Sequence, residues 1–109
     1  MGLDQTLKAH RNNDSEIIVE WRKQYWIDDF FMKLYNYNED GKYLLSSEDV
    51  ISLKRFCELC LKNPKMKQIV SKEETISDIM LIKTVNSINV FINTHNDLKD
   101  YKIYYTQSF

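Results

Sequence analysis

The hydrophobic residues of this chain recur mainly at helical spacing, and the longest such run extends from Glu16 to Tyr37. Ile17, Trp21 and Tyr25 follow one another at intervals of four residues, and no Gly or Pro interrupts the run. Residues spaced by three or four positions share one face of an α-helix. The pattern predicts one long helix over 16–37 that carries more apolar surface than a single face needs.

Two further helices are predicted. The first begins after Tyr43–Leu45, where Ser46 or Ser47 can cap it, and ends at Asn63–Pro64, because the residue before a proline avoids helical dihedral angles. The second is predicted from about Lys72 to Asn93, with Ser71 as the first member of a capping box. Its expected buried series is Ile76, Ile79, Met80, Val85, Ile88 and Ile92.

The two ends of the chain are expected to form strands. Residues 2–9 form a short segment of mixed apolar and polar residues. Residues 101–106 are β-prone and alternate apolar and polar positions. Two terminal strands and three helices predict an α+β fold, with a three-helix core and a small sheet formed by the N- and C-terminal strands. Residues 1–109 are expected to form one domain.

The net charge of −1 gives the whole molecule no long-range attraction for nucleic acid or an anionic membrane. Residues 28–49 are mainly acidic, however, and residues 52–72 are mainly basic. This layout is compatible with a charged partner, with head-to-tail self-association, or simply with a solvated surface. No apolar run approaches the about 20 residues of a membrane span, and residues 1–16 show no secretion signal.

Cys57 and Cys60 form a Cys-x-x-Cys motif whose thiols would share one helix face. A structural zinc site requires about four ligands, and His10 and His95 stand in separate polar segments. We therefore interpret the thiols as buried structural groups and the histidines as surface or capping residues. No metal is expected.

The acidic pair Asp28-Asp29 also lacks the arrangement of a catalytic pair, because neighbouring helix positions point about 100° apart. Solvent-exposed pairing with Lys33 is the interpretation that this spacing favours. With two glycines in the chain, a Gly-rich phosphate-binding loop is not expected. The sequence thus predicts no enzyme, no catalytic residue and no cofactor.

Four residues of the predicted first helix, Trp21, Arg22, Tyr25 and Trp26, are of the types that dominate protein interfaces. Trp26 lies about 140° around a helix from Trp21, so one narrow face cannot hold both. Either the fold wraps this helix on two sides, or Trp26 belongs to a partner surface or a homodimer interface. All four are partner-binding candidates.

A second set of partner-binding candidates is basic, and its members could contact phosphate groups. Aromatic residues that could stack on bases are missing from this stretch, so sequence-specific recognition is not predicted. The set comprises Lys54, Arg55, Lys62, Lys65 and Lys67.

Several pieces of the chain, in order, resemble one protein family. They are Met1–Asp4, Glu20–Lys23 with Ile27, Phe30 and Phe31 after it, Tyr43–Asp49 through Leu59-Cys60, and Tyr104–Phe109. The family consists of small, mostly uncharacterised proteins encoded by bacteriophages and prophages. It usually has a histidine where Asp28 stands here, and an aromatic- and Gly-rich loop before the last helix that this chain lacks. The resemblance implies a phage origin and pairing of the terminal strands, and it carries no established activity.

Together these observations predict a non-enzymatic, phage-encoded interaction protein in the host cytoplasm, without membrane association. It would bind a host protein stoichiometrically, with a component of antiviral defence as the candidate target. A second copy of the chain is the other partner considered. The alternative function is that of a nucleic-acid-binding accessory factor using residues 54–72.

Overall fold

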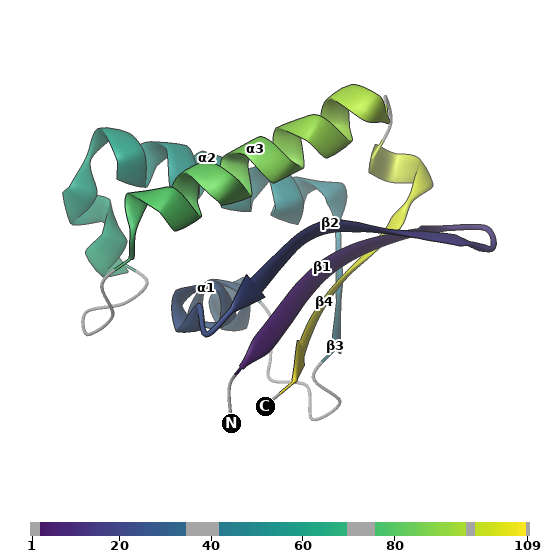
Figure 1. Cartoon of the computed structure of the whole chain (residues 1–109), viewed down its shortest axis with the longest axis horizontal. Helices are drawn as coiled ribbons and strands as arrows, with labels where there is room; N and C mark the ends of the chain where they lie inside the picture. The colour runs from purple at the N-terminus through teal and green to yellow at the C-terminus, as the bar shows by residue number, and fades with distance from the viewer. Residues whose placement is uncertain (1–2, 35–41, 70–75, 96–97, 109) are drawn as a thin grey trace.

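The computed structural model of the chain has an antiparallel four-stranded sheet with its three α-helices on one side (Figure 1). It describes residues 3–34, 42–69, 76–95 and 98–108. The strands are β1 (Asp4–Arg11), β2 (Asp14–Arg22), β3 (Lys42–Leu45) and β4 (Lys102–Ser108). The helices are α1 (Tyr25–Leu34), α2 (Ser47–Lys62) and α3 (Asp78–Thr94), with short 3-10 helices η1 (Pro64–Ile69) and η2 (Leu98–Asp100).

The strand order β2-β1-β4-β3 places the two terminal strands side by side at the centre of the sheet. Leu7 of β1 lies opposite Tyr105 of β4 in an antiparallel register. The predicted α+β class and the pairing of the two terminal strands are therefore confirmed. The sheet is larger than expected, because β2 and β3 extend it on either side.

The prediction of one helix over 16–37 is wrong. Residues 14–22 form strand β2, and the helix begins only at Tyr25. Of the three residues that suggested a helical stripe, Trp21 is buried whereas Ile17 and Tyr25 are 48% and 47% exposed. They do not share a face. The end of the predicted helix, 35–37, lies outside the described residues.

A β-bulge explains why β2 looks helical in sequence. Leu7 pairs with Val19, but the next residue, Lys8, pairs with Ile17, so Ile18 is the additional residue of the bulge. A bulge interrupts the regular alternation of a strand, and here Ile18 and Val19 are both buried although they are neighbours. The period of two that identifies a strand is therefore lost in this segment.

A tight corner connects β2 to α1. Lys23 has a φ of 57°, in the left-handed region that ends regular strand geometry, and its backbone N–H donates to the carbonyl of Leu3 at 2.7 Å. The chain then turns onto the helix side of the sheet. As a result Trp26, Ile27 and Phe31 are fully buried in the core.

The second predicted helix is confirmed as α2, since Ser46 is its N-cap and forms a reciprocal capping box with Asp49. Its expected entry segment, Tyr43–Leu45, belongs instead to β3. Helix α3 begins later than predicted, with Ser77 as its N-cap. The capping box predicted at Ser71 lies outside the described residues.

The burial of Trp26 next to the half-exposed Tyr25 yields a stability test. Trp26→Ala should lower the free energy of unfolding by about 3–5 kcal/mol, the usual result of truncating a core aromatic residue. Tyr25→Ala is the matched control, and its effect should be under about 1 kcal/mol. Urea denaturation followed by circular dichroism measures both, and equal losses would contradict the proposed core.

Candidate functional site

Of the two alternatives that the sequence left open for the tryptophans, enclosure by the fold or a place at a partner surface, the structure has the first. Trp21 and Trp26 are 3% and 0% exposed. Each indole N–H is bonded inside the fold, at 2.9 Å to Thr84 Oγ1 and to Gln24 Oε1 respectively. Trp21 faces the core from strand β2, opposite the buried Gln5, and Trp26 faces it from α1 after the corner at Lys23, so neither is available to a partner.

The other two candidates of that group remain on the surface. The side chain of Arg22 is 76% exposed and lies 3.8 Å from the Asp4 carboxylate. Tyr25 is half-exposed at the start of α1. Without the indoles, these two residues do not make a continuous aromatic surface.

The basic candidates separate into two groups. Arg55, Lys62 and Lys65 are exposed on α2 and η1, whereas Lys54 is half-buried. Arg55 and Lys62 line one shallow hollow together with Glu58 and Leu59. Because Glu58 stands between the two cations, the local charge is only weakly positive.

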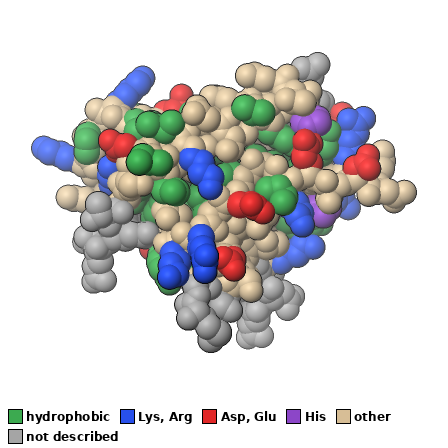
Figure 2. Space-filling model, viewed as in Figure 1, with side chains coloured by type: hydrophobic (Ala, Val, Ile, Leu, Met, Phe, Trp, Pro, Cys, Tyr) green, Lys and Arg blue, Asp and Glu red, His purple; other side chains and the backbone are tan. Residues whose placement is uncertain are grey.

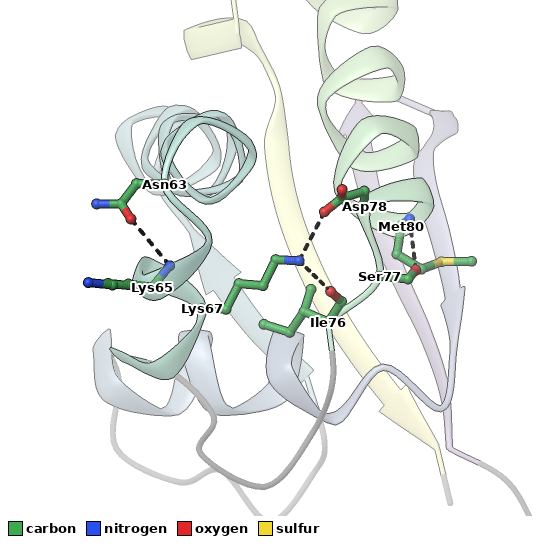
Figure 3. Close-up of polar contacts among 7 residues, drawn as sticks. All are labelled: Asn63, Lys65, Lys67, Ile76, Ser77, Asp78 and Met80. Atoms are coloured by element: carbon green, nitrogen blue, oxygen red, sulfur yellow. Dashed lines mark hydrogen bonds and ion pairs between the residues drawn. The ribbon is translucent and has the colours of Figure 1, made fainter.

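Lys67 has a structural role. Its ammonium donates to the backbone carbonyl of Ile76 at 2.8 Å and lies 2.9 Å from Asp78 Oδ1 (Figure 3). Its side chain is only 21% exposed. Lys67 thereby connects η1 to the start of α3, and its charge is already paired.

This role predicts different effects for two neighbouring lysines. Lys67→Met keeps the aliphatic chain but removes the donor to Ile76, so it should destabilise the fold by about 1–2 kcal/mol. Lys65→Met should change stability by less than about 0.5 kcal/mol, as is usual for an exposed residue. Urea unfolding measures the stability of both variants. An unchanged stability of Lys67→Met would contradict the structural role of Lys67.

The two cysteines are buried, with 0% exposure each. Burial raises the pKa of the Cys57 thiol to about 12. It also raises the pKa of Cys60, although the nearby Lys67 acts in the opposite direction. Both thiols are therefore protonated and poorly nucleophilic. Among the described residues, no cluster of three or more His, Cys, Asp or Glu side chains is placed to hold a metal ion.

A buried polar network occupies the core between β1, α1 and β4. Gln5 binds the backbone of Gln24 twice, accepting from its N–H at 2.9 Å and donating to its carbonyl at 2.8 Å. The same side-chain amide donates to the hydroxyl of Tyr105 at 2.9 Å, and that hydroxyl donates to Asp28 Oδ1 at 2.7 Å. Each bond links segments distant in sequence, so the network fixes α1 on the sheet.

Asp28 was expected to be solvent-exposed, and this expectation is wrong. The residue is only 9% exposed, and desolvation raises the pKa of its carboxyl group despite the hydrogen bond from Tyr105. Desolvation and the neighbouring Asp28 also raise the pKa of the Tyr105 phenol. No cleft opens onto the pair among the cavities found in the described residues, which supports a structural role.

The raised pKa of Asp28 has a consequence for stability. A carboxyl whose pKa is higher in the folded than in the unfolded state stabilises the fold when protonated, and this contribution is lost as the pH rises through the folded-state value. Asp28→Asn, which is neutral at every pH, should therefore gain stability relative to the wild type between about pH 4 and 7.

Urea unfolding at a series of pH values measures this difference, with the exposed Asp14→Asn as control. Each unit of pKa difference corresponds to about 1.4 kcal/mol. A stability difference that moved in favour of the wild type with rising pH would contradict the assignment.

A cleft of about 600 Å³ lies where the β1–β2 hairpin meets the end of α3. His95 lies at its edge, with Nε2 at 2.6 Å from Glu16 Oε2 and Nδ1 at 2.9 Å from the Tyr101 hydroxyl. Nδ1 is thus hydrogen-bonded to Tyr101, whereas Nε2 lies next to the Glu16 carboxylate without a hydrogen bond of good geometry. His95 is also the C-cap residue of α3, in agreement with a capping role, and it connects this helix to the hairpin.

The outward side of α3 carries exposed aliphatic residues among polar ones such as Lys83, Asn86 and Asn93. Three of its aliphatic residues, Ile79, Ile82 and Val90, are 74%, 46% and 64% exposed. With the exposed Asn86 they recur at spacings of three and four and form one row, which we call the α3 stripe. In Figure 2, hydrophobic side chains gather over α3 and the adjoining part of α2.

The α3 stripe was missed in the sequence, where Ile79 was assigned to the buried series. The side of α3 that packs on the core consists of Leu81, Thr84, Ile88 and Phe91. A usable signal was present nevertheless. Over its 17 residues, α3 contains only two charged side chains, Asp78 and Lys83, so its apolar residues exceed what one buried side requires.

Comparison with known proteins gives no match: no family model, curated protein or solved structure is significantly similar to this chain. Among the described helices, none combines the length and the apolar character that crossing a membrane requires.

Proposed function

We propose that this chain is a non-enzymatic interaction protein, which binds a protein partner stoichiometrically through the α3 stripe. The observation that carries the proposal is the exposure of Ile79, Ile82 and Val90 on one side of a helix whose opposite side is already buried. A helix that is hydrophobic on both sides is normally covered on both sides. In the monomer one side faces solvent.

The charges near the stripe support the same interpretation. Lys83 donates to the backbone carbonyl of Glu20 at 2.7 Å, and Asp78 is paired with Lys67. Both charged groups of α3 are therefore engaged within the protein. Depletion of free charge with retention of aliphatic side chains is typical of the centre of a protein interface.

The neighbouring helix provides a comparison within the same layer. Helix α2 contains six charged residues, Glu48, Asp49, Lys54, Arg55, Glu58 and Lys62. Its outward side is that of an ordinary solvated helix. Removing an exposed aliphatic side chain from water contributes about 1.5–3 kcal/mol when burial is complete. Helix α3 exposes three such side chains, Ile79, Ile82 and Val90, whereas α2 exposes Leu59.

The partner class follows from the resemblance to phage and prophage proteins. Small phage proteins commonly act on host proteins by occlusion, for which they need a surface and no catalytic group. A component of host antiviral defence is the proposed target. This part of the proposal is supported by the matching sequence pieces, Met1–Asp4 and Glu20–Lys23 among them.

A paired substitution tests the proposed surface. Ile79→Asp with Val90→Asp places two carboxylates on the stripe and should abolish capture of the partner from a bacterial host lysate. Leu44→Asp is the matched control, because Leu44 is also exposed, at 57%, but lies on the sheet. Stability should change by less than about 1 kcal/mol in all variants, since these positions face solvent.

The expected result is stoichiometric capture by the wild type and by Leu44→Asp, and none by the stripe variant. Capture of the same protein by the stripe variant, or no capture at micromolar concentration, would contradict the proposal. Analytical ultracentrifugation tests whether a second copy of the chain binds the α3 stripe. A wild-type dimer that the stripe variant converts to a monomer would assign this side of α3 to a second copy and overturn the host-protein assignment.

The alternative is nucleic-acid binding by the basic stretch 54–72. It is favoured by the exposure of Arg55, Lys62 and Lys65, and opposed by the pairing of Lys67 with Asp78. Helix α2 contains a single aromatic residue, Phe56, and it is buried. This surface could attract phosphates but offers bases no ring to stack on.

A further inference from the structure

The side of the sheet that faces away from the helices is a separate surface (Figure 1). On β1, Gln5, Leu7 and Ala9 are buried against the helices, and the alternating residues between them are partly exposed on the opposite side. The registers of the four strands identify which residues share that side. We call it the open sheet face, and it includes Thr6, Lys8, His10, Ile17, Glu20, Lys42, Leu44, Lys102, Tyr104 and Thr106.

Two rings lie next to each other at the centre of the open sheet face. Tyr104 belongs to β4 and His10 to β1, which are the two central strands. Their ring centroids are 5.3 Å apart, with the planes at 79°. Because both are partly exposed, they offer a planar ligand a small aromatic platform in the middle of a regular sheet.

Lysines surround these rings. Lys8 lies opposite Tyr104, and Lys102 lies opposite His10, in the β1–β4 register. From β3, the Lys42 ammonium lies 4.2 Å from the centroid of the Tyr104 ring. Three cationic side chains from three strands therefore meet around one aromatic side chain.

Two described acidic residues lie on the open sheet face, and Glu20 is in the row next to that of Lys8 and Tyr104. Glu20 is opposite Thr6, and Asp4 is paired with Arg22. The three lysines nevertheless keep the region around Tyr104 positive, although the chain has a net charge of −1. A ligand that complements it must combine a planar ring with regularly spaced negative charges.

We infer that the open sheet face binds a single-stranded polynucleotide, with one base stacked on Tyr104 and the adjacent phosphates bound by Lys8 and Lys102. Stacking on exposed aromatic side chains within a basic surface is the general mode of single-strand binding, and four-stranded sheets present central rings to RNA in this manner.

Neither of the other surfaces combines these features. The α3 stripe is mainly aliphatic, and the two charged residues of α3 are paired within the protein. Within α2 itself the only aromatic residue is the buried Phe56. In a base-paired duplex the flat sides of the bases are covered by stacking, so Tyr104 could not reach them. Preference for single strands is therefore part of the inference.

Fluorescence anisotropy with labelled oligo(U) RNA, oligo(dT) DNA and a duplex of equal length tests it. The wild type should bind one or both single strands at micromolar concentration, and more weakly as salt rises from about 50 to 200 mM. Tyr104→Leu should weaken binding about tenfold, the loss expected for one stacked base, whereas Tyr104→Phe should retain it. The two single-stranded probes distinguish RNA from DNA.

The charge requirement is tested with variants of equal charge change. Lys8→Glu with Lys102→Glu should reduce binding at least about tenfold, because two phosphate contacts become repulsive. Arg55→Glu with Lys62→Glu on α2 is the control and should bind as the wild type does. Circular dichroism and urea unfolding confirm that each variant is folded.

Four outcomes would overturn the inference: no binding of either single strand, tighter binding of the duplex, unchanged binding by Tyr104→Leu, or loss of binding only in the α2 variant. Loss in the lysine variant together with full binding by folded Tyr104→Leu would also overturn it. That result would indicate charge attraction without stacking, as for an acidic protein.

Discussion

The fold depends on the way Gln5 holds the corner between β2 and α1. One side-chain amide satisfies both backbone groups of Gln24, at the point where the chain leaves the sheet and where no regular ladder or helix can satisfy them. The same amide reaches Tyr105, whose hydroxyl donates to Asp28 in α1. An apolar residue at position 5 would leave the part-buried N–H of Gln24 without the acceptor that Gln5 provides. The Gln24 carbonyl would keep only the bond from the N–H of Ile27. This polar contact determines that Trp26 and Phe31 face the core.

How much of this could be read from the sequence varies by element. Helix α2 was predictable because its signals are local: a serine cap with an acidic residue three positions on, a helical stripe, and Asn-Pro at the end. Strand β2 was not, because the bulge at Ile18 replaces alternation with two adjacent buried residues, and Ile17, Trp21 and Tyr25 happen to repeat at helical spacing. That spacing is identical in both conformations, and only the pairing with β1 distinguishes them.

The candidate surfaces also differ in how far the sequence predicts them. Trp21 and Trp26 have the composition of an interface, but large aromatic side chains serve cores equally well, and tertiary structure decides between the two uses. The apolar excess that sequence analysis attributed to one long helix is present instead in α3. There it could have been found by counting charges, since a helix with only Asp78 and Lys83 over 17 residues cannot present an ordinary solvated side. The open sheet face was beyond such counting, because its residues come from four strands.

The two proposed surfaces are independent because a sheet and a helix each have two sides. Alternation along β1 and β4 directs Leu7 and Tyr105 into the core and Lys8 and Tyr104 away from it. Helix α3 packs on the core side of the sheet, and its exposed Ile79 and Val90 point away from the core into solvent. The α3 stripe and the open sheet face are thus separated by the full thickness of the core. A charge placed on one does not alter the other beyond long-range electrostatics, which physiological salt screens over about 8 Å. Protein binding and nucleic-acid binding by this chain are therefore separable by single-surface variants, and neither surface needs the other to be occupied.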